Sequence, residues 1–441
     1  MNVVPLSGRP GPGRGNSTQG ASIVAALDVG STKVCCLIAE YTPAKEKGGS
    51  APQKPEIKIK GMGHRVAHGI RNGVVVDIDA AERAIRAAVD RAERTAGVTI
   101  GGVFVNVSGG RPGCDGFTAE IKLNDGQVAD EHIDTALQFA RSRLDSQDRT
   151  ILHAAPVSYR LDENRGIRQP VGMFGDKLGV DVNAISVDPG PMRNLANCID
   201  HCHLNVHGFV IAPYASGRAV LVEDERQLGV TCIDMGGGTT SVSVFIEGNL
   251  VFADVVPVGG MHVTNDIARG LSTPVAHAER MKTLHGSALP SLCDDREMVP
   301  VPLVGERGRD TVAEVPKSML TGIIQPRLEE TFELIRDRMR ASGFARLAGR
   351  RAVLTGGASQ LTGVRELAAS TLDLQVRMGY PQKLLGIPEK AKGPAFAVAG
   401  GLLDYAVSPD ADTVTWPGVI EASSTRDGYL SRVSRWIKDS F

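Results

Sequence analysis

We predict an α/β protein with two lobes, because the 441-residue chain contains the same pattern of strand, turn and strand twice. In the first copy, IVAALDVGSTKVCCLIAE, the turn follows Asp28, and in the second, VTCIDMGGGTTSVSVFIEG, it follows Asp234. A repeat on this scale indicates two structurally related lobes. A third turn, with two glycines, follows the strand expected at residues 351–354, and a chain of this length exceeds one ordinary domain.

The periodicity of apolar residues predicts the remaining elements. Asp79 is expected to cap the first long helix, whose buried face carries Ile85, Ala88, Val89 and Ala92. Further helices are expected at residues 131–144, 188–202, 261–271, 275–284, 328–340 and 394–403. Pro326 lies near the start of the helix expected at 328–340. Further strands are expected at residues 103–107, 209–211 and 351–354, short strands within 108–185, and a Pro-containing loop at 290–302.

The composition narrows the classes of function. The chain has 49 basic and 50 acidic residues and a net charge of −1, whereas a protein that binds nucleic acid by bulk electrostatics is strongly basic. We therefore expect no nucleic-acid partner. The scattered cysteines and a first segment without an apolar core behind a basic end indicate a cytosolic protein with reduced thiols. No run of about 18 apolar residues is present, so we expect no membrane-spanning helix.

The Gly-rich turns have the composition of a nucleotide site. Glycines let consecutive backbone N–H groups approach phosphate oxygens, and hydroxyl groups add further donors. Mg²⁺ is commonly held by one or two carboxylates together with phosphate and water, and Asp28 and Asp234 precede the two turns. A single turn of this kind is simply a hairpin turn. Two matched copies favour a two-sided clamp for a Mg²⁺–nucleotide, with the turn at Gly356 and Gly357 against the nucleoside.

These motifs resemble the superfamily of actin, DnaK-type chaperones and sugar kinases. More narrowly, the chain resembles the FtsA family of bacterial cell-division actin homologues. The narrower resemblance rests on NVSGG from Asn106, LHAAPVSY from Leu152, QPVG from Gln169, LTGGASQLTGV from Leu354 and the terminal SRWIKDSF. It covers residues 22–406 and the extreme C-terminus.

The resemblance implies an actin-like two-lobe ATPase fold with an FtsA-type inserted subdomain. The first lobe core would comprise 22–107 with 186–225 and 393–406, followed by an inserted subdomain at 108–185. The second lobe core would comprise 226–258 with 326–392, and its small subdomain 259–325. Outside these parts, the residue pattern predicts a disordered tail at 1–21, a linker at 407–428 and an amphipathic membrane-targeting helix at 429–441.

The resemblance also implies site residues. Phosphate and metal would be met by Asp28, Gly30, Ser31, Thr32 and Lys33, and by Asp234, Gly236, Gly237, Gly238 and Thr239. Asp28 and Asp234 are the candidate metal ligands. Adenosine would be met by Gly356 and Gly357, and the ribose by Glu279 and Lys282.

The implied function is that of an ATP- and Mg²⁺-binding protein that self-associates into filaments. Such proteins tether the FtsZ ring to the cytoplasmic face of the inner membrane at the division septum and recruit later division proteins. The C-terminal tail of FtsZ would dock on the small subdomain of the second lobe. Candidate residues for this contact are Arg307, Arg309, Lys317 and Arg327.

One position departs from the wider superfamily. DnaK-type chaperones carry an acidic residue before the Pro of the connecting segment, close to the attacking water. Here that position is Ala212, which can neither accept a proton nor orient water. We therefore expect tight ATP binding with weak hydrolysis, in a protein that is not primarily a catalyst.

The last residues form an amphipathic pattern. On a helix of about 100° per residue, the apolar side chains share an arc of roughly 140° and the basic ones lie opposite. The membrane-facing candidates are Leu430, Val433, Trp436, Ile437 and Phe441, with Arg432, Arg435 and Lys438 on the cationic face. A cationic face opposite an aromatic one favours an interfacial helix on anionic lipid. The alternative is a helix that docks on its own protein.

An enzymatic alternative belongs to the same superfamily. A sugar or acetate-type kinase would share the nucleotide turns, but it needs a positioned carboxylate base for the acceptor hydroxyl, and the sequence offers none that can be assigned. A soluble kinase also has no use for the amphipathic tail.

Overall fold

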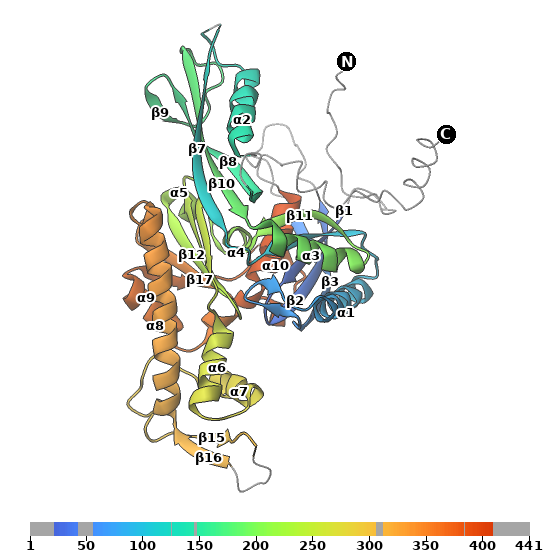
Figure 1. The fold of residues 1–441 in the computed structure, drawn as a ribbon, viewed down its shortest axis with the longest axis vertical. Helices are drawn as coiled ribbons and strands as arrows, with labels where there is room; N and C mark the ends of the chain where they lie inside the picture. Colours follow the sequence, from blue (N-terminus) through green and yellow to red (C-terminus); the bar gives the residue numbers. More distant parts are fainter. Residues whose placement is uncertain are drawn as a thin grey trace, which may run out of the picture.

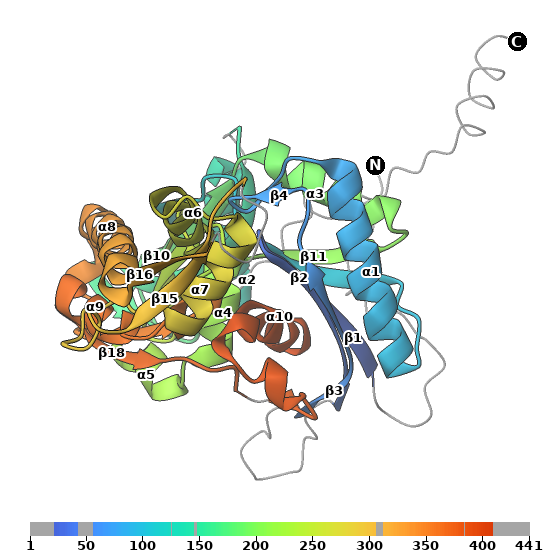
Figure 2. The ribbon, with the colours of Figure 1, turned by 90° about the horizontal axis from the view of Figure 1, so that it is seen from below.

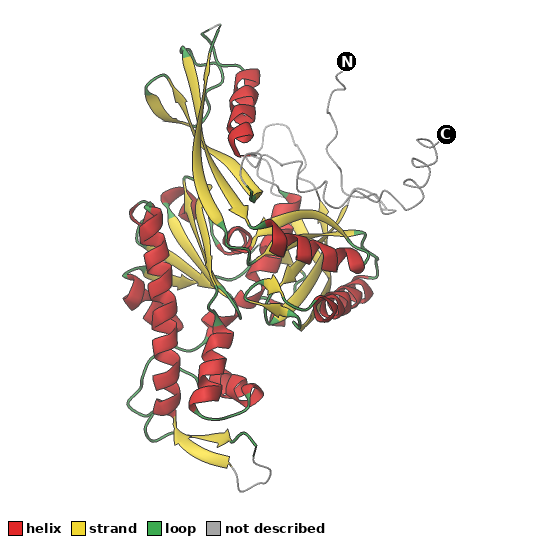
Figure 3. Ribbon diagram, viewed as in Figure 1, coloured by secondary structure: helices red, strands yellow, loops and turns green. Residues whose placement is uncertain are grey.

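Two large sheets, one in each lobe, form the centre of the computed structural model (Figure 1). The structure describes residues 22–42, 56–124, 126–144, 148–305, 312–382 and 384–408. Each lobe has its own hydrophobic core. A third, smaller sheet extends from one end of the molecule, and Figure 3 shows one helix beside its strands.

The first sheet has the order β11-β6-β1-β2-β3-β19. Its strands are β1 (Ser22–Val29), β2 (Lys33–Thr42), β3 (Glu56–Val66), β6 (Gly102–Val107), β11 (Asn205–Ile211) and β19 (Leu384–Leu385). β1 and β2 are antiparallel and form the predicted hairpin, with Asp28 opposite Cys35, while β6 runs parallel to β1. Both hairpin strands are almost continuously apolar and buried, as expected for strands covered on both faces.

The second sheet repeats this arrangement. Its order is β14-β13-β12-β17-β18, formed by β12 (Val230–Met235), β13 (Thr240–Ile246), β14 (Asn249–Val256), β17 (Arg351–Thr355) and β18 (Gln375–Met378). β12 and β13 form an antiparallel hairpin, and β17 lies parallel to β12 as β6 lies parallel to β1. Strand for strand, β14-β13-β12-β17-β18 corresponds to β3-β2-β1-β6-β11, so the predicted repeat is confirmed.

Helices cover the faces of both sheets, and Figure 2 shows α1 and α10 on opposite sides of the first one. These helices include α1 (Ile78–Ala96), α3 (Pro189–His201), α8 (Lys317–Ser342), α9 (Val364–Leu372) and α10 (Ala397–Val407). The lobes are joined through α4 (Ala212–Val220) and α5 (Glu223–Leu228), and α6 (Gly260–Gly270) and α7 (Val275–His285) follow the second hairpin. No described helix is both long and apolar enough to cross a bilayer.

The inserted segment forms a separate four-stranded sheet of order β7-β10-β8-β9. Its elements are β7 (Gly113–Lys122), α2 (Asp130–Leu144), β8 (Thr150–Leu161), β9 (Asn164–Ile167) and β10 (Lys177–Val187). The prediction of short strands here was wrong for β7, β8 and β10, which are 10, 12 and 11 residues long. Small apolar side chains of the sheet pack against α2 in their own cluster. The structure also contains two small two-stranded sheets. One is formed by β4 (Ile70–Arg71) and β5 (Val74–Val75), and the other by β15 (Met298–Pro302) and β16 (Val312–Pro316).

Four predicted boundaries were wrong. Asp77, not Asp79, caps α1, because its side chain accepts a hydrogen bond from the Ala80 N–H. α8 begins at Lys317 and contains Pro326 in its interior. The buried Leu320, Thr321 and Ile324 extend the packed face of the helix toward its start. The expected loop at 290–302 ends in β15, and residues 394–396 form a 3₁₀ turn before α10.

Candidate nucleotide site

The turns of the two hairpins face and touch each other. Gly237 lies so close to Thr32 that a Cβ at this position would be 2.3 Å from the Thr32 Cγ2 atom. Gly238 stands in the same relation to Ser31, whose Oγ would lie 2.4 Å from an added Cβ. Only glycine fits where the two chains approach this closely. The structure therefore brings together the two turns that the sequence matched to each other.

Each turn is closed in the same way. The Gly30 N–H donates to the Lys33 carbonyl at 3.0 Å, and the Gly236 N–H donates to the Thr239 carbonyl at 2.8 Å. The first turn is also held from outside, because the Ser31 hydroxyl accepts a hydrogen bond from the Gly73 N–H at 3.0 Å. The two turns are thus preorganised before any ligand binds.

The two aspartates lie beneath these turns, at the ends of β1 and β12. Asp28 is 7% exposed and Asp234 is 8% exposed. Burial raises the pKa of Asp28 to about 6, although Lys33 opposes the shift. Burial and the neighbouring charge of Asp28 raise the pKa of Asp234 to about 7. Two buried carboxylates that repel each other are a setting that a divalent cation would stabilise, since its charge would offset both.

The two aspartates suit a Mg²⁺ ion whose other ligands are phosphate oxygens and water molecules. The described residues contain no group of three or more His, Cys, Asp or Glu side chains that could enclose a metal. Mg²⁺ dehydrates reluctantly and is often held by one or two carboxylates plus substrate phosphates. Asp28 and Asp234 fit this role, with the remaining positions left to the ligand.

The third turn packs directly on the second aspartate. Gly356 has φ of +91°, and a Cβ there would lie 2.3 Å from Asp234 Oδ1, so both backbone conformation and space require glycine. The preceding Thr355 donates its hydroxyl to the Gly379 carbonyl at 3.0 Å. The turn at Gly356, predicted to face the nucleoside, is therefore in direct contact with Asp234, which is predicted to lie near the phosphates.

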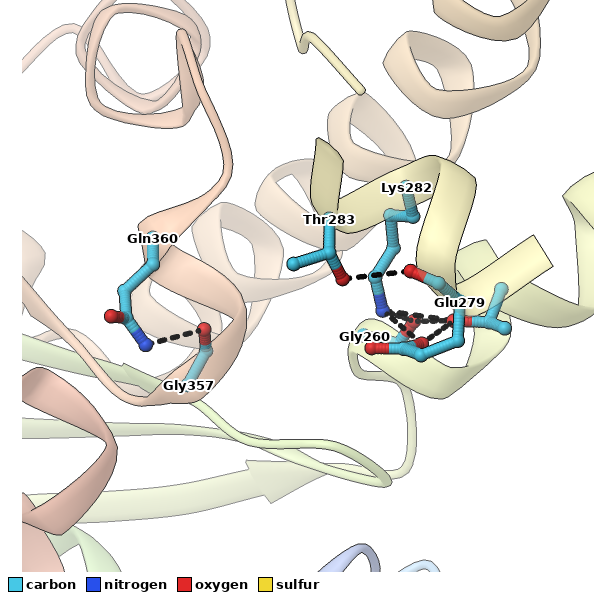
Figure 4. A network of polar contacts seen from close by, with 7 residues as sticks. Gly260, Glu279, Lys282, Thr283, Gly357 and Gln360 are labelled. Atoms are coloured by element: carbon cyan, nitrogen blue, oxygen red, sulfur yellow. Dashed lines mark hydrogen bonds and ion pairs between the residues drawn. The ribbon is translucent and has the colours of Figure 1, made fainter. Parts of the chain in front are cut away.

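Glu279 and Lys282 form a polar network on α7, beside the start of α6 (Figure 4). Lys282 Nζ donates to the Gly260 carbonyl at 3.1 Å, to Thr264 Oγ1 at 2.8 Å and to Glu279 Oε2 at 2.7 Å. Gly260 in turn donates its N–H to the Gly236 carbonyl at 3.0 Å. The network is thus connected to the second turn through Gly260.

Lys33 occupies a position that its sequence motif does not reveal. Its Nζ donates to the Ala395 carbonyl at 2.5 Å and lies 3.7 Å from the centre of the Phe396 ring. It therefore links the first turn to the segment that leads into α10. Its charge also lowers the pKa of both site aspartates, although more weakly than burial raises it.

Sequence reasoning missed several residues that support the turns. Asn106 is buried and accepts a hydrogen bond from the Val29 N–H at 2.7 Å, directly beside the first turn. Ser216 of α4 hydrogen-bonds Asp234 and lowers its pKa. Gly259 and Gly260 lie against the carbonyls of the second turn. A polar residue inside an apolar strand was the available signal for Asn106, and a Gly-Gly pair before a helix was the signal for Gly259 and Gly260.

Ala212 begins α4 and is buried. The preceding Ile211 N–H donates to Nε2 of His153, from the inserted subdomain, at 3.0 Å. Ala212 therefore offers only a methyl side chain at this position. The hydrogen bond from Ile211 to His153 joins the start of α4 to the insertion.

Two of the four residues predicted to bind a partner already have acidic partners. Lys317 pairs with Glu297 at 2.9 Å, and Arg327 pairs with Asp266 at 2.5 Å and with Glu330. Arg307 and Arg309 lie outside the described residues, as do the expected N-terminal tail, nearly all of the linker and the whole C-terminal helix.

Two known protein families match parts of this chain. The family described as "Cell division protein FtsA" matches residues 231–401. The family described as "SHS2 domain inserted in FTSA" matches residues 109–186, which include β7, β8, β9 and all but the last residue of β10.

Three curated relatives, each named "Cell division protein FtsA", align over nearly the whole chain. The relative from Agrobacterium fabrum is 46% identical over 426 residues, covering 96% of both chains. The relative from Neisseria meningitidis is 35% identical and covers 95% of this chain and 98% of its own. The relative from Escherichia coli is 30% identical with the same coverage.

Among solved structures, the chain is similar to one titled "PilM-PilN type IV pilus biogenesis complex". The TM-score is 0.59 at 17% sequence identity, over 87% of this chain and 98% of that one. At this identity the similarity concerns the fold alone, which is an actin-like fold of two related lobes with an inserted subdomain.

Proposed function

The chain belongs to the FtsA family of cell division proteins, and from this premise we propose that it is an ATP-binding protein that links the FtsZ ring to the membrane. Its family membership makes it an actin-like cell division protein. The proposal adds the ligand, the partners and the place of action. Its main support is the contact between Thr32 and Gly237, which sets two preorganised turns on either side of one site.

The proposed ligand is Mg²⁺–ATP. Backbone N–H groups and hydroxyls of the turns at Ser31 and Thr239 would hold the phosphates, and Asp28 and Asp234 would hold Mg²⁺, directly or through water. Gly356 and Gly357 would lie against adenosine, and Glu279 and Lys282 would face the ribose. The bound cation would neutralise phosphate charge, while the residues of this chain hold and orient the nucleotide.

Hydrolysis is proposed to be slow. The start of α4 offers the methyl group of Ala212 where a base or water-orienting carboxylate would be needed. Bound ATP would then act mainly as a brace between the lobes, since both hairpin turns would contact one nucleotide. Filaments of the closed, ATP-bound form are the proposed assembled state.

The proposed site of action is the cytoplasmic face of the inner membrane at the division septum. The basic and apolar faces predicted for residues 429–441 support an anchor on anionic lipid. A single short helix of this kind binds weakly, so self-association would increase membrane affinity through avidity. The FtsZ tail is the proposed partner of the small subdomain of the second lobe, and later division proteins are further proposed partners.

Vesicle co-sedimentation tests the proposal. The full chain and a chain ending at Asp427 would be incubated with ATP, Mg²⁺ and anionic vesicles. We expect only the full chain to pellet with lipid, and to carry FtsZ with it. If both chains pellet equally, the tail is not the anchor. If neither recruits FtsZ, the tether function fails.

A further inference from the structure

A pocket of about 250 Å³ lies where the inserted subdomain meets the second lobe. One wall comes from β8 and β10 of the insertion, through His153, Ala155 and Ile185. The other walls come from α4, from α5 and from the turn between β13 and β14, near Leu250. None of these residues belongs to the nucleotide turns, so the pocket is a separate feature of the fold.

His153 presents an unsatisfied donor in this pocket. Its side chain is 5% exposed, and its Nε2 accepts the hydrogen bond from the Ile211 N–H. Burial and the nearby charge of Arg218 lower its pKa to about 3, so the ring is neutral and carries its proton on Nδ1. That Nδ1 atom is buried and has no hydrogen-bond partner in the described part of the chain. A buried donor without a partner destabilises the folded protein.

Arg226 contributes a second unsatisfied donor from α5. Its Nε atom is buried and has no hydrogen-bond partner among the described residues. The acidic residue Glu247, at the rim, pairs with Arg168 of the insertion at 3.3 Å. Two N–H donors, one of them cationic, therefore line the pocket without a hydrogen-bond partner among the described residues, although Glu223 and Glu247 contribute carboxylates to the same lining. The missing group is an oxygen acceptor for these donors.

We propose that this pocket binds a small organic carboxylate, held by Arg226 Nε and His153 Nδ1. The guanidinium group is planar and matches a carboxylate better than a point anion. The apolar walls at Ala155, Ile185 and Leu250 fit a short hydrocarbon chain. At about 30 Å³ per water molecule, the pocket has the volume of about eight waters, which suits a metabolite rather than a folded segment.

Such a ligand would brace the insertion against the second lobe. The two parts already touch, because Asn183 of β10 donates to the Leu250 carbonyl at 3.0 Å and the Cys114 thiol of β7 donates to the Val251 carbonyl at 3.4 Å. A carboxylate between His153 and Arg226 would add a charge-assisted contact across the same junction. The site would thus couple the orientation of the insertion to a small molecule, independently of ATP.

The test uses the full-length protein with its histidines labelled with ¹⁵N. The probes are acetate, succinate, glutarate, L-glutamate and citrate, each at about 20 mM, well above a millimolar Kd. Glutaramide, which has the length of glutarate but no charge, is the matched uncharged probe. We expect at least one carboxylate to shift the imidazole nitrogens of His153, with saturating Mg²⁺–ATP present, and glutaramide to leave them unchanged.

Two variants identify the site. His153→Gln keeps an acceptor for the Ile211 N–H but removes the Nδ1 donor, and Arg226→Gln removes the cationic donor. Each should weaken the affinity for the bound carboxylate by about tenfold or more, the range expected for a hydrogen bond to a charged group. Arg165→Gln, at an exposed arginine of β9, is the control and should bind like the wild type.

The outcomes are decisive in both directions. If no carboxylate shifts the His153 signals, the pocket holds only water and the proposal is overturned. Equal binding of glutaramide, or equal affinity of the Arg226→Gln and Arg165→Gln proteins, also overturns it. Should His153→Gln fail to fold, the Arg226→Gln protein still decides the result by calorimetry.

Discussion

Thr32 and Gly237 are in contact across the two lobes, although 204 residues separate them in the chain. A methyl group at Gly237 would overlap the Thr32 side chain, with Cγ2 at 2.3 Å and Oγ1 at 2.5 Å from the added atom. The closed arrangement of the two hairpin turns thus depends on one residue without a side chain facing one β-branched residue.

Gly237→Ala should separate the two turns. We expect the free energy of unfolding to fall by about 1–3 kcal/mol, as for other overpacked sites, and ATP affinity to fall by about tenfold. Chemical denaturation and fluorescent-nucleotide titration measure the two effects. Gly116→Ala is the control, because an added Cβ there meets nothing within 4 Å.

A second substitution sharpens this test. Thr32→Ala removes both of the nearest clashing atoms, so the double variant with Gly237→Ala should regain part of the lost stability. Additive losses in the two single variants and the double variant would mean that the turns do not touch in solution.

The stability of the nucleotide-free protein should depend on pH through the site aspartates. The folded-state pKa values of Asp28 and Asp234, about 6 and about 7, lie above their ordinary value of 3.8. The folded state therefore holds extra protons between about pH 4 and pH 7, and this contribution to stability is lost as the pH rises through that range. Asp234→Asn should remove much of the loss, so its melting temperature should exceed that of the wild type increasingly from pH 5 to pH 8.

Mg²⁺–ATP should reverse this trend. A cation requires ionised carboxylates, so the stabilisation by Mg²⁺–ATP should grow from pH 6 to pH 8 in the wild type and be strongly reduced in Asp234→Asn. Thermal melts across this pH series give both results. Asp115→Asn, at an exposed residue, should follow the wild type throughout. A pH-independent difference between Asp234→Asn and the wild type would contradict the assignment.

The repeated turns could be predicted from the sequence because their pattern is local. Asp28 and Asp234 each end an apolar strand and precede glycine, and the structure brings them together as the repeat implied. The predicted helix cap, Asp79, was wrong, because only the geometry shows that the Asp77 side chain accepts the hydrogen bond from the Ala80 N–H.

Other features depend on contacts between distant segments. From the sequence, Pro326 predicts the start of a helix, because proline lacks an N–H and is favoured in the first turn. Burial of Leu320 and Ile324 in the second core instead extends α8 toward its N-terminus by about two and a half turns before this proline. The Lys33 contact with Ala395 and the pocket at His153 join residues that no local pattern connects.

Ala212→Asp should increase ATP hydrolysis. It places a carboxylate at the first position of α4, where an acidic side chain is also favourable for the helix. We expect phosphate release to rise at least several-fold over the slow wild-type rate. Ala212→Asn is nearly identical in size and lacks the charge, so it should stay at the wild-type rate. Equal rates in all three proteins would place the attacking water elsewhere.

Lys282→Ala should weaken nucleotide binding. The ammonium group holds Gly260, Thr264 and Glu279 together beside the second turn, so its removal leaves Glu279 without its cation. A loss of about five- to tenfold in ATP affinity is expected, measured by fluorescent-nucleotide titration. Arg280→Ala changes an exposed cation on the same helix and should leave the affinity unchanged.

The two tryptophans of the chain allow a matched test of the membrane anchor. Trp436 lies on the apolar face predicted for residues 429–441, whereas Trp416 lies in the expected linker. Trp436→Glu replaces a large apolar side chain by a charge, and burial of such a side chain contributes about 1.5–3 kcal/mol, so vesicle binding should fall by about tenfold or more. Trp416→Glu adds the same charge outside the predicted helix and should pellet with anionic vesicles like the wild type. If both variants lose binding equally, a general charge effect and not the apolar face of the helix controls attachment, because only the position of the charge differs between them.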